Sequence, residues 1–129
     1  MHKSKKKLKK VLIVEDDSLL VRVLYDTFVS EKFDVQTVEN GLEVQDIAKK
    51  FSPDMILLDL IIPGIDGFEV LRKLKSNEST RKIPVVILSN IDEIGDVKAG
   101  RTLGADEYFI KANVEIEKIV AYVKDKLYI

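Results

Sequence analysis

Short apolar runs alternate along the chain with segments in which apolar residues recur every three or four positions. The runs cover residues 11–14, 33–38, 55–59, 85–89 and 107–111. Runs of this length predict strands, and the wider spacing predicts amphipathic helices. Helical spacing extends from Leu19 to Phe28, Val44 to Phe51, Val70 to Leu74, Val97 to Leu103 and Ile116 to Leu127. The pattern therefore predicts five strands, each followed by a helix.

Strict alternation of nearly continuous apolar strands with helices predicts a parallel sheet that is covered by helices on both faces. The turn residues agree with this division, because Pro53 and Pro84 precede predicted strands and Gly104 suits the end of a helix. In such sheets ligands bind at the carboxyl ends of the strands. Polar residues at those ends are therefore the first candidates for a functional site.

Four of the predicted strands end in residues that carry a charge or a hydroxyl group. These residues are Glu15 and Asp16, Asp59, Ser89, and Lys111. Carboxylate oxygens are the ligands that Mg²⁺ prefers, and a cation with a hydroxyl group suits the oxygens of a phosphoryl group. Adjacent carboxylates repel each other unless a positive charge lies among them. We therefore expect Glu15 and Asp16 to hold Mg²⁺ close to Lys111.

Some of these polar residues have simpler explanations. Asp17 or Ser18 is expected to cap the first helix, and Asp66 is expected to cap the third. Asp59 lies too far upstream of that third helix to cap it. Ser89 alone would be read as a turn residue, and Lys111 alone as a solvated strand end. Their joint occurrence at strand ends favours one functional site.

Length and composition indicate one globular domain. The chain has 129 residues, of which 46% are hydrophobic and 33% are charged. No apolar run approaches the roughly 18 residues of a membrane span. The absence of Cys excludes disulfides and thiolate chemistry, so a cytoplasmic location is the default expectation.

The amino terminus is strongly basic, because six of the first ten residues are Lys and none is acidic. We expect residues 1–9 to form a flexible, solvated leader and residues 10–129 to form the domain. A short Lys run of this kind is more typical of a solvated segment, so we do not expect the chain to bind nucleic acid.

Four stretches, "VLIVEDD", "MILLDLIIPGIDG", "VVILSN" and "GADEYFIK", resemble the signature stretches of the response-regulator receiver domain. This family, which includes the chemotaxis regulators, supplies the phosphoacceptor half of two-component signalling. The resemblance extends from residue 10 to about residue 127. It implies a flavodoxin-like (βα)₅ three-layer sandwich with a five-stranded parallel sheet in the order 2-1-3-4-5.

The resemblance also implies a role for each candidate residue. Asp59 would accept a phosphoryl group from a histidine kinase or a phosphotransfer protein. Ser89 and Lys111 would contact the phosphoryl oxygens, and Ser89 with Tyr108 would form the switch. The implied Mg²⁺ ligands are Asp16, Asp59 and the backbone carbonyl of Ile61, with Glu15 acting through a bound water.

The implied function is a phosphoacceptor switch of a two-component system or phosphorelay. Such a domain is not an enzyme in the usual sense, because it catalyses only its own phosphorylation and dephosphorylation. A downstream protein would bind the surface formed by the fourth helix, the fifth strand and the fifth helix. The sequence leaves open whether the receiver acts alone or is a fragment of a larger regulator.

Position 112 departs from the family pattern. Most receivers have Pro after the Lys, joined by a cis peptide, whereas this chain has Ala112. A cis bond costs about 2.5–4 kcal/mol before other residues and about 0.5–1 kcal/mol before Pro, so the bond is either strained or trans.

Ile61 and Ile91, two positions beyond Asp59 and Ser89, cannot hydrogen-bond an attacking water. They predict slow loss of the phosphoryl group.

Two other classes of function remain. A phosphatase of the haloacid dehalogenase type also uses an Asp after an apolar strand, but it needs a second Asp two residues later, where this chain has Ile61. A pseudo-receiver would keep the fold as a binding module without phosphorylation. It normally lacks part of the acid and Lys set, which is complete here.

Overall fold

The computed structural model of the chain describes residues 7–127. Five parallel strands form one sheet in the order β2-β1-β3-β4-β5. The strands are β1 (Lys10–Val14), β2 (Asp34–Val38), β3 (Met55–Leu58), β4 (Val85–Ser89) and β5 (Glu107–Ile110). The predicted strand order and doubly wound fold are confirmed.

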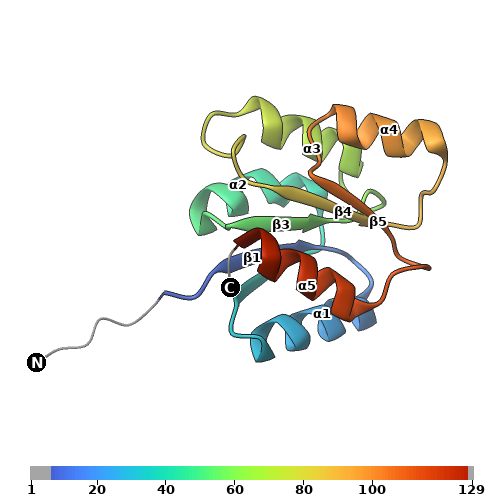
Figure 1. The fold of residues 1–129 in the computed structure, drawn as a ribbon. Helices are drawn as coiled ribbons and strands as arrows, with labels where there is room; N and C mark the ends of the chain where they lie inside the picture. The colour runs from blue at the N-terminus through green and yellow to red at the C-terminus, as the bar shows by residue number, and fades with distance from the viewer. Residues whose placement is uncertain (1–6, 128–129) are drawn as a thin grey trace, which may run out of the picture.

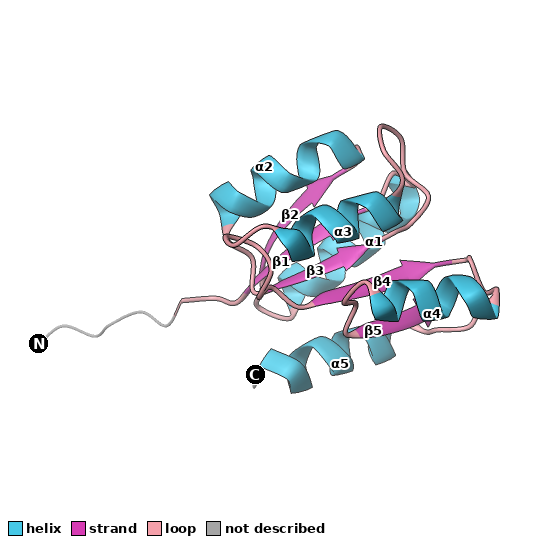
Figure 2. Cartoon of the chain, turned by 90° about the horizontal axis from the view of Figure 1, so that it is seen from above, coloured by secondary structure: helices cyan, strands magenta, loops and turns pink. Residues whose placement is uncertain are grey.

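The helices cover both faces of the sheet, so the domain has three layers. They are α1 (Ser18–Ser30), α2 (Gly41–Phe51), α3 (Gly67–Ser76), α4 (Ile94–Thr102) and α5 (Ile116–Leu127). Helices α2, α3 and α4 lie on one side of the sheet, and α1 and α5 lie on the other (Figure 1). Figure 2, seen from above, shows α2, α3 and α4 lying over the strands.

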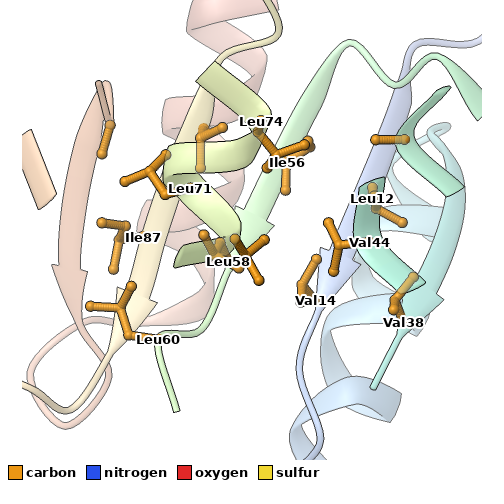
Figure 3. Close-up of a cluster of buried hydrophobic side chains, with 14 of the residues drawn as sticks. Leu12, Val14, Val38, Val44, Ile56, Leu58, Leu60, Leu71, Leu74 and Ile87 are labelled. Atoms are coloured by element: carbon orange, nitrogen blue, oxygen red, sulfur yellow. The ribbon is translucent and has the colours of Figure 1, made fainter. Parts of the chain in front are cut away.

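Each strand contributes to two hydrophobic clusters because successive side chains point to opposite faces of a sheet. In β1, Leu12 and Val14 pack with residues of α2 and α3, whereas Val11 and Ile13 pack with residues of α1 and α5. Figure 3 shows the first of these clusters, in which Leu12 and Val14 lie near Val44 of α2. Both faces of the central strands are therefore buried, and the strands read as continuous apolar runs.

Helix ends form where the sequence predicts them. The Asp17 side chain accepts hydrogen bonds from the backbone N–H groups of Leu19 and Leu20, and Asp66 accepts one from Glu69. These two N-caps confirm the predictions for α1 and α3. Gly104 has a φ of +113° directly after the end of α4, a conformation that glycine adopts without strain.

Four strand boundaries differ from the prediction by one residue, and the first of these is the start of β1, which begins at Lys10. The N–H of Phe33 donates to Phe28 at the end of α1 instead of to a neighbouring strand, so β2 begins at Asp34. Asp59 and Lys111 each keep one hydrogen bond to the next strand, from Asp59 N–H to the carbonyl of Val14 and from Lys111 N–H to that of Ser89, before the chain turns away. Both residues therefore lie one position beyond their strands.

The basic leader lies largely outside the described residues, which begin at residue 7. Lys7, Leu8 and Lys9 are exposed and precede β1. The flexibility of the leader stays a prediction. Within residues 7–127, no helix is both long enough and apolar enough to span a membrane.

Candidate functional site

The candidate residues gather at the carboxyl-terminal edge of the sheet. Glu15 and Asp16 follow β1, and Asp59 follows β3, which is the direct neighbour of β1 in the sheet. Ser89 ends β4 and Lys111 follows β5. The sequence order of the strands reverses between β1 and β3, which is the point where open α/β sheets bind ligands. The fold therefore brings five residues from four separate strand ends to one edge of the sheet.

Lys111 lies between two buried carboxylates. Its Nζ is 2.7 Å from Oδ2 of Asp59 and 2.7 Å from Oε1 of Glu15. Only 2% of Glu15 and 5% of Asp59 is exposed to solvent. Buried charges are costly unless they are paired and hydrogen-bonded, and one ammonium group here partners both carboxylates. Lys111 is thus the counterion of the site.

The second oxygen of Glu15 is held by the backbone. Oε2 accepts hydrogen bonds of 3.2 Å from the N–H groups of Asp16 and Asp17. Burial raises the pKa of Glu15 above its ordinary value, and the negative charge of Asp59 adds to this, while the hydrogen bond from Lys111 opposes it. The carboxyl group of Glu15 is therefore fixed in position by two backbone N–H groups of its own loop and by the ammonium group of Lys111.

The pKa of Lys111 is raised. Burial alone would lower it, but the hydrogen bonds to Asp59 and Glu15 and the charges of these two residues together outweigh burial. The ammonium form is therefore favoured in the folded protein, and the pocket holds a permanent positive charge against its carboxylates.

Three carboxylates in the pocket form a candidate metal site. One oxygen from each of Glu15, Asp16 and Asp59 lies within 4.8 Å of the others. Glu15 and Asp59 are buried, whereas Asp16 is exposed at the mouth of the pocket. A set of carboxylate oxygens without nitrogen or sulfur ligands suits a hard divalent cation such as Mg²⁺. The residues present fit the predicted ion.

Ser89 and Tyr108 contact the same short segment after β4. Ser89 is fully buried, and its Oγ accepts a hydrogen bond of 3.4 Å from the N–H of Ile91. Tyr108 is buried as well, and its hydroxyl donates to the carbonyl of Ile91 at 2.6 Å. Burial raises the pKa of Tyr108, so its hydroxyl stays protonated as a donor. The Tyr108 ring therefore lies inward, next to the loop that Ser89 begins.

The peptide bond between Lys111 and Ala112 is trans. The N–H of Ala112 donates to Oδ1 of Asn90 at 2.9 Å. Asn90 was not predicted from the sequence. A signal was present, since replacing the usual Pro with Ala adds a backbone donor that needs a partner.

Gly67 is a second residue of the site that was not predicted from the sequence. A Cβ atom at this position would lie 2.3 Å from Cα of Leu60 and 2.7 Å from the carbonyl oxygen of Asp59. The first residue of α3 therefore packs directly against the backbone that follows β3. The "DG" pair of Asp66 and Gly67 at the start of this helix was the available signal, because only glycine permits such a close approach.

The fold and the pocket together define a class of protein, namely a doubly wound α/β domain with an acidic, Lys-containing site at its switch point. The response regulator receiver domain family matches residues 11–124 of the chain. The chain belongs to this family. The resemblance seen in the four sequence stretches is therefore confirmed.

Individual relatives agree with the family assignment. The chain is 34% identical over 115 residues to the DNA-binding dual master transcriptional regulator RpaA of Synechocystis sp., covering 89% of this chain and 47% of RpaA. The chain spans about half the length, or less, of the first curated relatives it matches.

Two solved structures are similar as well. The phosphorylated cyanobacterial phytochrome response regulator RcpA has a TM-score of 0.77 and 30% identity, over 92% of this chain and 91% of RcpA. The Mn²⁺-bound form of response regulator Rcp1 has a TM-score of 0.79 and 28% identity, over 90% of this chain and 91% of Rcp1.

The family defines the general function. A receiver domain is the phosphoacceptor switch of a two-component response regulator, and it is not an enzyme that turns over other substrates. The trio of Glu15, Asp16 and Asp59 fits a phosphoacceptor site of this kind. Neither the family match nor the pocket favours the pseudo-receiver alternative.

Proposed function

We propose that Asp59 accepts a phosphoryl group from a histidine kinase or a phosphotransfer protein, and that Mg²⁺ is the ion of the site. The observation that carries the proposal is the position of Lys111, which forms ion pairs of 2.7 Å with both Asp59 and Glu15. A Lys in this position neutralises charge where a phosphoryl group would add it. The Mn²⁺-bound form of the similar regulator Rcp1 supports a divalent cation.

The proposed metal ligands are side-chain oxygens of Asp16 and Asp59 and the backbone carbonyl of Ile61, with Glu15 acting through a water. When bound, Mg²⁺ would neutralise charge on the phosphoryl oxygens. The N–H of Ile61 already donates to Oδ1 of Asp59 at 3.1 Å, so this loop closes around the acceptor carboxylate. That hydrogen bond holds Asp59 in one orientation for attack.

Phosphoryl transfer to Asp59 would be an in-line displacement. A carboxylate oxygen of Asp59 forms the new O–P bond while the P–N bond of the donor phosphohistidine breaks, and the electron pair leaves with the imidazole nitrogen. Lys111 would move from the free carboxylate to a phosphoryl oxygen without leaving the pocket. Ser89 would donate its hydroxyl hydrogen to another phosphoryl oxygen.

The proposed signal leaves the site through Ser89 and Tyr108. When Ser89 turns towards the phosphoryl group, the inward position of Tyr108 is stabilised, and its hydrogen bond to the carbonyl of Ile91 holds the loop after β4. The surface formed by α4, β5 and α5 would then bind a downstream protein. We propose that this occurs in the cytoplasm and involves protein partners, not nucleic acid bound directly by the receiver.

Treatment with phosphoramidate, a small phosphodonor, tests the proposal. In the presence of Mg²⁺ the wild-type protein should gain the mass of one phosphoryl group, and a chelator should prevent this. Asp59→Asn should gain none. Asp66→Asn is the matched control, because it is the same chemical change on an exposed residue of the same loop, and it should behave as wild type. A phosphoryl group that persists in Asp59→Asn would refute the assignment, and no uptake by wild type would favour the pseudo-receiver.

A further inference from the structure

The loops that follow β4 and β5 are joined by a side chain at the edge of the pocket. The last backbone hydrogen bond between these strands runs from Lys111 N–H to the carbonyl of Ser89 at 3.0 Å. One residue further on, the Asn90 side chain takes the place of the backbone and accepts from Ala112 N–H at 2.9 Å. Asn90 therefore extends the pairing of β4 and β5 by one rung.

This extension fixes the backbone of Lys111 from both sides. Its own N–H is held by Ser89, and the next N–H along the chain is held by Asn90. The two hydrogen bonds flank the Cα of Lys111, from which its long side chain reaches between Asp59 and Glu15. A Lys side chain has four rotatable bonds, so the position of its ammonium group depends on how firmly its Cα is held.

The contact requires both residues that this chain has at these positions. Pro at position 112 would have no N–H to donate. Ala112 supplies that donor, and Asn90 supplies an acceptor directly after Ser89. Asn90 is exposed, and within residues 7–127 its side chain makes no hydrogen bond to Glu15, Asp16 or Asp59, so its effect on the site must pass through Lys111.

We infer that Asn90 is a positioning residue for phosphoryl transfer, which acts by clamping the backbone beside Lys111 through the N–H of Ala112. The inference rests on the proposed function, since it assigns Lys111 to the phosphoryl oxygens. In this protein the Asn90–Ala112 pair does by hydrogen bonding what a rigid Pro would do by its ring.

The experiment measures the rate of phosphorylation by phosphoramidate in Mg²⁺ for four proteins, namely wild type, Asn90→Ala, Ala112→Pro and the double variant. Losing one neutral hydrogen bond should slow Asn90→Ala about three- to tenfold. The same change should have no further effect in the Ala112→Pro background, because the donor is already absent there.

The half-saturating concentration of phosphoramidate and the affinity for Mg²⁺ separate positioning from a structural role. The rate at saturating phosphoramidate should fall in Asn90→Ala, whereas the half-saturating concentration and the affinity for Mg²⁺ should stay at their wild-type values. Asn113→Ala is the matched control, because Asn113 is exposed in the same loop after β5 and its side chain makes no hydrogen bond with the described part of the chain. It should react at the wild-type rate.

Each outcome decides the inference. A wild-type protein that takes up no phosphoryl group contradicts the proposed function and the clamp with it. If wild type reacts and Asn90→Ala reacts equally fast or faster, the clamp alone is wrong, and a faster rate would mean that Asn90 obstructs the pocket. An equal loss from Asn90→Ala in the wild-type and Ala112→Pro backgrounds would also contradict it, because the effect would then not pass through Ala112.

Discussion

Replacing Lys111 with Met removes the positive charge of the pocket while keeping a side chain of similar length. Glu15 and Asp59, which are 2% and 5% exposed, would then be two buried carboxylates without their shared partner. Buried charges that lose a partner are strongly destabilising, because the remaining charge has neither water nor a counterion. We therefore expect Lys111→Met to destabilise the metal-free protein.

The expected loss in the free energy of unfolding follows from the burial of the ion pairs that Lys111 forms with Glu15 and Asp59. Removing one partner of a buried ion pair costs about 3–5 kcal/mol. The Lys111 side chain is 17% exposed and the neighbouring Asp16 is exposed, so we expect the lower end of this range, about 3 kcal/mol near neutral pH. Lys124 provides a matched control, since it forms an ion pair with Glu31 in which each side chain is more than one-third exposed to solvent. Lys124→Met should cost about 0–1 kcal/mol.

The loss should depend on pH in a defined direction. The pKa of Glu15 is raised in the folded protein above the ordinary value of 4.5, so the folded state binds a proton more readily than the unfolded state does. Stability contributed by this group therefore falls as the pH rises from 4.5 through the raised pKa. Without Lys111 the pKa of Glu15 should be raised further. Lys111→Met should therefore recover stability as the pH is lowered towards 4.5, the ordinary pKa of Glu.

Urea unfolding of both variants, with and without Mg²⁺, measures these effects. Mg²⁺ should restore part of the stability of Lys111→Met, because the ion supplies the missing positive charge and binds only the folded state. If Lys111→Met loses no more stability than Lys124→Met, and if its stability does not change with pH or Mg²⁺, then Lys111 is not the counterion of a buried acidic pocket.

Three further predictions concern other residues of the site. Mg²⁺ should raise the melting temperature of wild type more than that of Asp16→Asn, which should itself be more stable than wild type without metal; equal shifts would exclude Asp16 as a ligand. Ile61→Asn and Ile91→Glu should lose the phosphoryl group several-fold faster than wild type, because polar side chains can orient the attacking water; decay of the phosphorylated protein measures this, and unchanged rates would mean that these isoleucines are not the gate. Gly67→Ala should lose about 1–3 kcal/mol in urea unfolding, because its Cβ would lie 2.3 Å from Cα of Leu60, and unchanged stability would contradict that close packing.

The sheet could be predicted because its strands are buried on both faces. Runs such as "VLIV" and "VVILS" have no polar side to be confused with a helix, and β4 begins and ends where the sequence places it. Asp17 and Asp66 were predictable as caps because the geometry of an N-cap is local. The strand ends at Asp59 and Lys111 were misplaced by one residue, because each keeps a ladder hydrogen bond while its chain turns away.

The site was predictable at the level of residue types and strand ends, and less so in its contacts. A parallel sheet brings Glu15, Asp59 and Lys111 to one edge whatever the details of the loops. No sequence pattern shows that Lys111 contacts both carboxylates at once, or that Tyr108 is turned inward onto the carbonyl of Ile91. These contacts depend on side-chain rotamers and on the path of the loops, as does the contact between Asn90 and Ala112.

The central claim is that the phosphoryl group resides on Asp59. Borohydride reduces an acyl phosphate of aspartate to homoserine, so the modified residue can be located by sequencing the peptides of the treated protein by mass spectrometry. After treatment with phosphoramidate and Mg²⁺, we expect homoserine at position 59 and unmodified side chains at Glu15 and Asp16. A reduced residue at either of those positions, or a phosphorylated protein that borohydride leaves unchanged, would contradict it.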